Sequence, residues 1–190
     1  MRDLQPRLTI AFVMKDELNN YLFRQDAYTY AVLDGASVPH LPNHLHEMGA
    51  RHSCLYRGEL SDEMMHVAPY MILLERDSVF CNWLFTECWG KHWGIFAQSP
   101  LSPGRMRRQL RTILTVDDDL GNPMLFRYYD PRVLVPFLVT CTIDELNFIF
   151  GQIKYFFAES FDKSEICRMH IANGALVETR LGFGTGPDAQ

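Results

Sequence analysis

Hydrophobic and polar residues follow two different periods along the chain, one typical of helices and one typical of strands. Short apolar runs rich in aromatic and β-branched residues end at turn residues, and the clearest of them runs into Asp34-Gly35. Between these runs, apolar residues recur every three or four positions, as they do on the buried side of a helix. The clearest helical stretch has four such residues on one face: Phe80, Trp83, Leu84 and Cys88.

These patterns define a series of expected elements. The predicted strands are residues 28–33, 54–56, 70–74, 92–97, 152–157 and 175–180. The predicted helices are residues 42–48, 61–67, 78–88, 103–114, 132–139 and 142–150. Residues 115–117 and 124–129 flank a Gly-Asn-Pro turn and are expected to form a hairpin. Thr142 and Glu145 have the spacing of a capping box at the start of the last helix.

Because strands and helices alternate, we expect an α/β or α+β fold with a mixed β-sheet and flanking helices. A single compact domain with a small helical C-terminal part is predicted. The expected organisation is an N-terminal segment of helix or strand over residues 1–27, a central domain over residues 28–158, and a partly flexible extension over residues 159–190.

Composition and charge narrow the classes of function. The 190 residues are 47% apolar, which is enough for one substantial core. The 18 Lys and Arg against 23 Asp and Glu give a formal charge of −5. Binding to a nucleic acid or an anionic membrane depends on a basic excess. We therefore expect neither partner.

The cysteines and the apolar runs indicate a compartment. Five cysteines without any C-x-x-C pair are typical of free thiols in a reducing environment. The apolar run of residues 8–14 is followed by charged residues rather than by a cleavage pattern, and no run reaches the ~18 apolar residues of a membrane span. The sequence therefore predicts a cytoplasmic protein.

Candidate chemistry is sparse. Four histidines occur within thirteen residues, but Pro39 and Pro42 interrupt the helix that would align them, so no metal site and no cofactor are expected. Asp34 and Asp130 each follow an apolar run. Such carboxylates either line a ligand crevice or accept backbone N–H groups in their own turns.

Six segments of the chain resemble one family in order and content. They are YAVLDGA from residue 30, CLYRGEL from 54, VAPYMILL from 67, WGKHWGIF from 89, RYYDPRVL from 127 and FG at 150–151. Together they are similar to the adaptor domain of the type VI secretion effector chaperones, over about residues 28–157. The resemblance implies a non-catalytic protein that binds and stabilises one cognate toxic effector. It also implies delivery of that effector to the valine-glycine-repeat spike protein VgrG or to its PAAR-type tip.

The same resemblance supplies the candidate site residues. We expect partner binding, through an apolar or helical segment of the effector, at Trp89, His92, Trp93, Arg127, Tyr129, Asp130 and Arg132. Structural roles are expected for Asp34, Gly35, Tyr56, Gly58, Pro69 and Trp83.

Two alternatives remain open at this stage. In the RYYDPR motif, Arg127 and Arg132 either bracket Asp130 on the wall of a binding groove, or Arg127 pairs with Asp130 in a purely architectural turn. The alternative function is a small cytoplasmic hydrolase that uses Asp34, Asp130 and His92, which would have to converge in one cleft.

Overall fold

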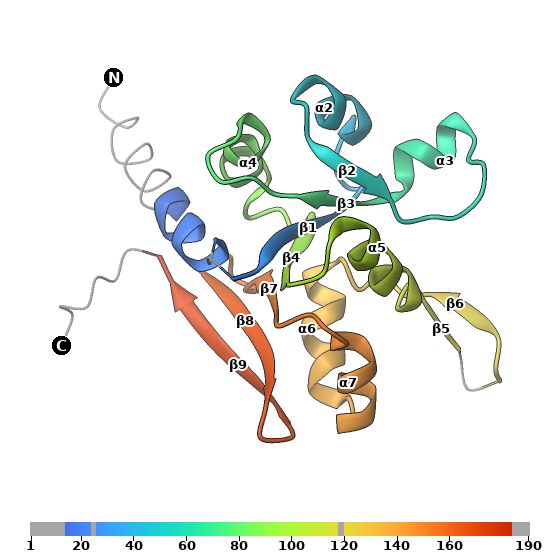
Figure 1. The fold of residues 1–190 in the computed structure, drawn as a ribbon, viewed down its shortest axis with the longest axis vertical. Coiled ribbons are helices and arrows are strands. Elements are labelled where there is room, and N and C mark those ends of the chain that lie inside the picture. Colours follow the sequence, from blue (N-terminus) through green and yellow to red (C-terminus); the bar gives the residue numbers. More distant parts are fainter. Residues whose placement is uncertain (1–13, 24–25, 118–119, 184–190) are drawn as a thin grey trace.

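The computed structural model describes residues 14–23, 26–117 and 120–183. A seven-stranded sheet in the order β2-β3-β1-β4-β7-β8-β9 forms its centre (Figure 1). Its strands are β1 (Tyr28–Asp34), β2 (Arg51–Cys54), β3 (Pro69–Leu73), β4 (Gly94–Ser99), β7 (Tyr155–Glu159), β8 (Glu165–Ala172) and β9 (Ala175–Gly182). A separate hairpin consists of β5 (Thr115–Asp117) and β6 (Pro123–Leu125). The fold is thus α+β, as predicted.

Helices occupy the connections between most of the strands. They are α2 (Leu41–Glu47), α3 (Asp62–Val67), α4 (Val79–Trp83) with the π-helical turn η1 (Leu84–Cys88), α5 (Pro103–Thr112), α6 (Pro131–Thr140) and α7 (Ile143–Phe150). Residues 14–22 are also helical. Within the described part of the chain, none of the helices combines the length and apolar character needed to cross a membrane.

The sheet separates two cores because successive side chains of a strand point to opposite faces. Tyr30 and Val32 of β1 lie in the core that is covered by α5, α6 and α7. Ala31 and Leu33 lie in the core that is covered by the helix of residues 14–22, α2 and α4. Burial on both faces explains why the central strands are continuous apolar runs in the sequence.

Every strand pairing described is antiparallel, although the alternation of strands and helices favoured a mixed sheet. The crossovers account for the difference. Strands β1 and β2 run in the same direction, but they are separated by β3, which is antiparallel to both. Likewise β1 lies between β3 and β4. The connections from β1 to β2 and from β3 to β4 therefore each skip one strand position, and a strand of opposite direction fills it.

The C-terminal part is extended rather than helical. Strand β8 was not predicted, and it pairs with both β7 and β9 (Figure 1). The predicted domain boundary at residues 158 and 159 falls inside β7, and the sheet continues beyond it. Residues 1–13 and 24–25 of the predicted N-terminal segment, and residues 184–190 of the predicted extension, lie outside the described residues.

Three strand boundaries differ from the predictions for local reasons. Strand β2 lies earlier than predicted because its register with β3 begins at Arg51, an exposed residue without an apolar pattern. Strand β4 begins only at Gly94 because His92 has a left-handed backbone, with φ of 55°. Strand β6 ends at Leu125, since Tyr128 and Tyr129 turn into the core.

Candidate functional site

Asp34 and Arg127 join the first and the fifth of the resembling segments. Asp34 ends β1, and its carboxylate accepts hydrogen bonds from the Ala36 amide (3.0 Å) and the Ser37 hydroxyl (2.7 Å) in its own turn. Arg127 Nη2 donates to Oδ2 of the same carboxylate at 2.5 Å, across 93 positions of sequence. The hydrogen bond with Asp34 raises the pKa of Arg127. The pair holds the loop before α6 against the end of β1.

Asp130 and Arg132 form a second, local pair. Asp130 is the N-cap of α6 and accepts the Arg132 amide at 2.9 Å. The Arg132 guanidinium also donates Nε and Nη2 to the two carboxylate oxygens, at 2.9 and 2.7 Å. Burial acts to raise the pKa of Asp130, but the hydrogen bonds from Arg132 lower it below the usual value. Of the two alternatives for the RYYDPR motif, the architectural one, in which Arg127 pairs with Asp130, is wrong, because Arg127 reaches the buried carboxylate of Asp34 instead.

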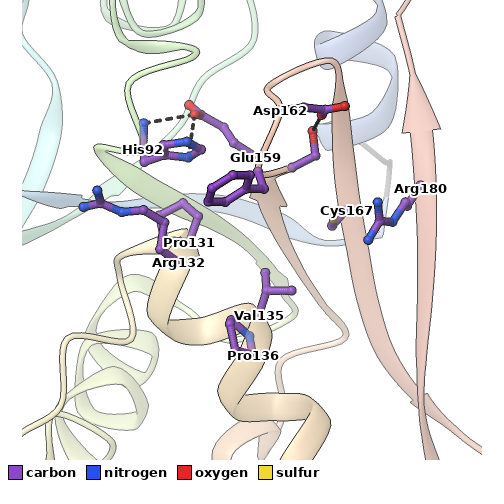
Figure 2. Close-up of a pocket in the computed structure, with 11 residues that line it drawn as sticks. His92, Pro131, Arg132, Val135, Pro136, Glu159, Asp162, Cys167 and Arg180 are labelled. Carbon is purple, nitrogen blue, oxygen red and sulfur yellow. Dashed lines mark hydrogen bonds and ion pairs between the residues drawn. The ribbon is translucent and has the colours of Figure 1, made fainter.

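A pocket of about 420 Å³ opens between the start of α6, the turn after β7, and strands β8 and β9 (Figure 2). We call it the charged pocket. It is lined by His92, Pro131, Arg132, Val135, Pro136, Glu159, Ser160, Phe161, Asp162, Cys167 and Arg180. Of the seven predicted partner-binding residues, it brings together two, His92 and Arg132.

Glu159 and His92 form a buried acid–imidazole pair in this pocket. Their side chains are only 5% and 10% exposed, and His92 Nδ1 lies 3.3 Å from Glu159 Oε2. The Glu159 carboxylate also accepts the amides of Gly90 and His92, both at 3.0 Å. These two bonds hold the loop before β4, which includes the left-handed backbone at His92.

Burial disfavours the charged form of both members of this pair. Burial raises the pKa of Glu159 to about 7, against the two amide hydrogen bonds that favour its charged form. Burial lowers the pKa of His92, and the nearby charges of Lys163 and Arg132 act in the same direction. Chemically, the pair can hold and exchange a proton near neutral pH. Glu159 was not predicted, although it ends an apolar strand just as Asp34 does.

The other predicted partner-binding residues lie outside the charged pocket. Trp89 packs edge-on against Phe183, with ring centroids 5.1 Å apart. Trp93 is half-buried and has the ammonium of Lys91 over its ring at 4.3 Å. Tyr129 is only 2% exposed and packs in the core, so in this structure it has no surface to offer a partner.

Several residues with predicted structural roles hold the backbone in place. A Cβ on Gly35 would lie 2.3 Å from the Ala68 carbonyl oxygen, so this close approach requires glycine. The Pro69 carbonyl accepts the Leu55 amide at 2.9 Å. Gly58 has φ of 82°, a conformation that favours glycine. Trp83 packs against His44, with ring centroids 4.7 Å apart.

Tyr56 belongs to a loop that is held by arginines of α5. Arg111 donates to the carbonyls of Leu55, at 2.9 Å, and of Tyr56. Arg107 donates to the Cys54 carbonyl at 3.1 Å. Arg107 and Arg111 of α5 therefore anchor the chain after β2.

The three residues of the alternative hydrolase site are not gathered in one pocket. His92 lines the charged pocket, whereas Asp34 and Asp130 do not. Both aspartates accept hydrogen bonds from backbone amides and from arginines. The second of the two expectations for these carboxylates, that they accept N–H groups in their own turns, is confirmed.

A second concave surface, which we call the apolar groove, lies between the β5–β6 hairpin, α6 and α7. Its volume is about 310 Å³. It is lined by Ile113, Thr115, Val116, Phe126, Phe137, Asp144, Glu145, Phe148 and Ile149. Phe148 is 62% exposed, and the rings of Phe126 and Phe137 lie 4.4 Å apart. Sequence patterns did not identify this groove, since its residues come from three separate elements, β5, α6 and α7, and from the segments after α5 and β6.

Residues 14–23, 26–117 and 120–183 contain no cluster of three or more His, Cys, Asp or Glu side chains with the arrangement of a metal site.

Comparisons with known proteins place the chain in a family. Neither the curated proteins nor the solved structures include a significant match. Residues 29–147 match the family described as "Domain of unknown function (DUF4123)". The match runs from β1 into α7 and includes the Asp34–Arg127 pair. It ends before Phe148 and Ile149, but it includes the other residues that line the apolar groove. It covers more than half of the sequence, and the chain therefore belongs to the DUF4123 family.

Proposed function

We propose that this protein is a cytoplasmic type VI secretion effector chaperone, or adaptor. It binds and stabilises a cognate toxic effector and promotes loading of that effector onto the VgrG or PAAR spike, without catalysing a reaction itself. The resembling segments support this proposal, as does membership of a family that is known in contexts associated with type VI effectors.

The observation that carries the proposal is the apolar groove. Phe148 leaves most of its ring exposed beside a floor of packed aromatic side chains. Met124 and Leu125 of the adjoining hairpin are each about half exposed. Contiguous exposed apolar surface of this kind marks interaction sites on soluble domains. A client segment that covers the groove would remove both surfaces from water, which is the main driving force for such association.

The size of the molecule is sufficient for this role. A standard interface buries about 800 Å² on each partner. The accessible surface of the protein is 11153 Å², so one client would cover less than a tenth of it. The remaining surface is available for the spike, and a modest interface permits the release that a loading factor needs.

Co-expression with the effector encoded beside the gene tests the proposal. We expect the effector to be more soluble in the presence of the adaptor and to co-purify with it through size-exclusion chromatography. An effector from an unrelated cluster serves as the control client and should not co-purify. Absence of a complex, together with unchanged effector solubility, would contradict the proposal.

A second candidate is supported by the Glu159–His92 pair. A carboxyl group with a pKa near 7 beside an imidazole, in an open pocket, has the composition of a general acid–base site. This would be a variant of the predicted hydrolase, with Glu159 in place of the two aspartates. Ester hydrolysis that is abolished by Glu159→Gln would favour this candidate, and an unchanged background rate would count against it.

A further inference from the structure

We propose that the apolar groove binds an amphipathic helix of the client, and that lysine or arginine residues flank the apolar face of this helix and meet Asp144 at the rim. This inference rests on the proposed function and adds the location of the site and the chemistry of its occupant. The charged pocket, in which two of the predicted site residues lie, is then not the primary client site.

The floor and walls of the groove are apolar. Phe126 and Phe137 pack against each other at the floor, and Ile149 lies beside them. The wall formed by the hairpin includes Val116, which lies directly opposite Met124 in the β5–β6 register. Because directly opposed residues of a hairpin share a face, the half-exposed Met124 extends this wall.

The opposite wall is a ridge of α7. Asp144 and Phe148 are four residues apart, and so are Glu145 and Ile149, so these four side chains form two adjacent rows along the helix. A helical partner can place its own ridge beside such rows. The groove is bounded by side chains from helices and a hairpin, and helix-in-groove recognition relies on this kind of surface.

The charge at the rim is of one sign. Asp144 and Glu145 are the only charged residues among those that line the groove, and both are acidic. Glu145 is already engaged, since its carboxylate accepts the Thr142 amide at 2.7 Å in the capping box. Asp144 is exposed, and the structure gives it no hydrogen bond or ion pair within the described residues. It is therefore the rim group that can pair with a cation of the client.

Two substitutions separate the groove from the rest of the surface. Phe148→Ser removes the most exposed aromatic ring of the groove, and Phe161→Ser removes an even more exposed ring, 90% accessible, at the charged pocket. Both positions are largely solvent-exposed, so neither change is expected to unfold the protein. Asp144→Asn has its control in Glu63→Gln, which removes one exposed negative charge on α3, an element that does not line the groove.

The first experiment measures capture of the neighbouring-gene effector by the intact chain and its variants. Phe148→Ser should weaken capture by about thirtyfold or more, whereas Phe161→Ser should leave it unchanged. If wild type captures the effector and Phe148→Ser captures it equally well, the inference is overturned while the proposed function stands. If both phenylalanine variants lose capture equally, the assignment to the groove is also overturned. If wild type captures nothing, it is the proposed function that fails.

A second experiment measures which helical peptides the groove binds in the absence of the effector. It uses two designed sixteen-residue helical peptides with the same leucine face, one flanked by lysines and the other by glutamates. The lysine peptide should bind more tightly in fluorescence anisotropy, and Asp144→Asn should weaken it by about two- to fivefold while Glu63→Gln does not. Equal effects of Asp144→Asn and Glu63→Gln would overturn the pairing at the rim. Binding unaffected by Phe148→Ser would overturn the site.

Discussion

Removal of the Arg127 guanidinium should expose how much the fold depends on the link between β1 and the loop before α6. Arg127→Met keeps most of the aliphatic stem and leaves the Asp34 carboxylate, whose side chain is 3% exposed, without its cation. Loss of one partner from a fully buried ion pair costs about 3–5 kcal/mol, whereas loss of an exposed pair costs about 0–1 kcal/mol.

The structure places this pair between the two limits. The Arg127 side chain is 46% exposed, so water can partly replace its Nη2 donor. Asp34 also keeps the Ala36 amide and the Ser37 hydroxyl. We therefore expect a loss of about 2 kcal/mol of unfolding free energy. For a chain of this length this loss corresponds to a fall in Tm of about 4–8 °C.

Thermal unfolding followed by circular dichroism provides the measurement. Lys154→Met is the matched control, because it removes an ion pair at 2.6 Å in which the cation is about as exposed as Arg127, at 41%, but the carboxylate of Asp26 is 73% exposed. Its cost of about 0–1 kcal/mol should lower Tm by no more than about 4 °C. A double-mutant cycle with Asp34→Asn should give a coupling of about 1 kcal/mol or more. Equal Tm shifts for Arg127→Met and Lys154→Met, or a coupling near zero, would refute the reasoning.

Three further predictions concern other parts of the structure, and thermal unfolding tests each of them. The pKa of Glu159 is about 7 in the folded state against 4.5 for the free side chain, so the folded state binds more protons between these values. Its contribution to stability therefore falls as the pH rises through this range, and wild type should lose up to about 3 kcal/mol relative to Glu159→Gln between pH 4.5 and 7; parallel pH profiles would contradict this. Gly35→Ala places a Cβ against the backbone of Ala68 and should cost more than about 2 kcal/mol. The control is Gly104→Ala in the first turn of α5, where the added Cβ meets no atom within 4 Å and should stabilise the protein by up to about 1 kcal/mol. Similar Tm values for the two alanine variants would show that the close contact at residue 35 does not destabilise the fold. Thr142→Ala removes the capping box of α7 and should cost about 1 kcal/mol, whereas an unchanged Tm would mean that packing alone fixes the start of this helix.

Several elements were predictable because their signals are local. The capping box of Thr142 and Glu145 forms within four residues, and it starts α7 where the sequence indicates. Ser61 and Ser78 likewise cap α3 and α4 with their own side chains. Strand β1 ends at Asp34, whose carboxylate accepts an amide only two positions further on.

The candidate site was less predictable because its residues meet from distant parts of the chain. His92 was named, but its partner Glu159 lies 67 positions later. Arg127 was also named, yet the acidic partner nearest in sequence, Asp130, is not the one it reaches. The groove around Phe148 involves three elements and two connecting segments, and an exposed phenylalanine on an amphipathic helix gives no signal of its own.

Amino-acid order by itself determined most of the local elements, the combination of helices with a sheet, and the turns in which Asp34 and Asp130 accept amides. Hydrogen bonds over two to four positions and hydrophobic periodicity are properties of neighbouring residues. Tertiary structure alone decided the antiparallel strand order, the addition of β8 to the sheet, the Asp34–Arg127 link and the apolar groove. Each of these depends on which distant segment comes to lie alongside another. That choice is made by burial of both faces of the sheet over the whole molecule, and no short stretch of sequence contains it.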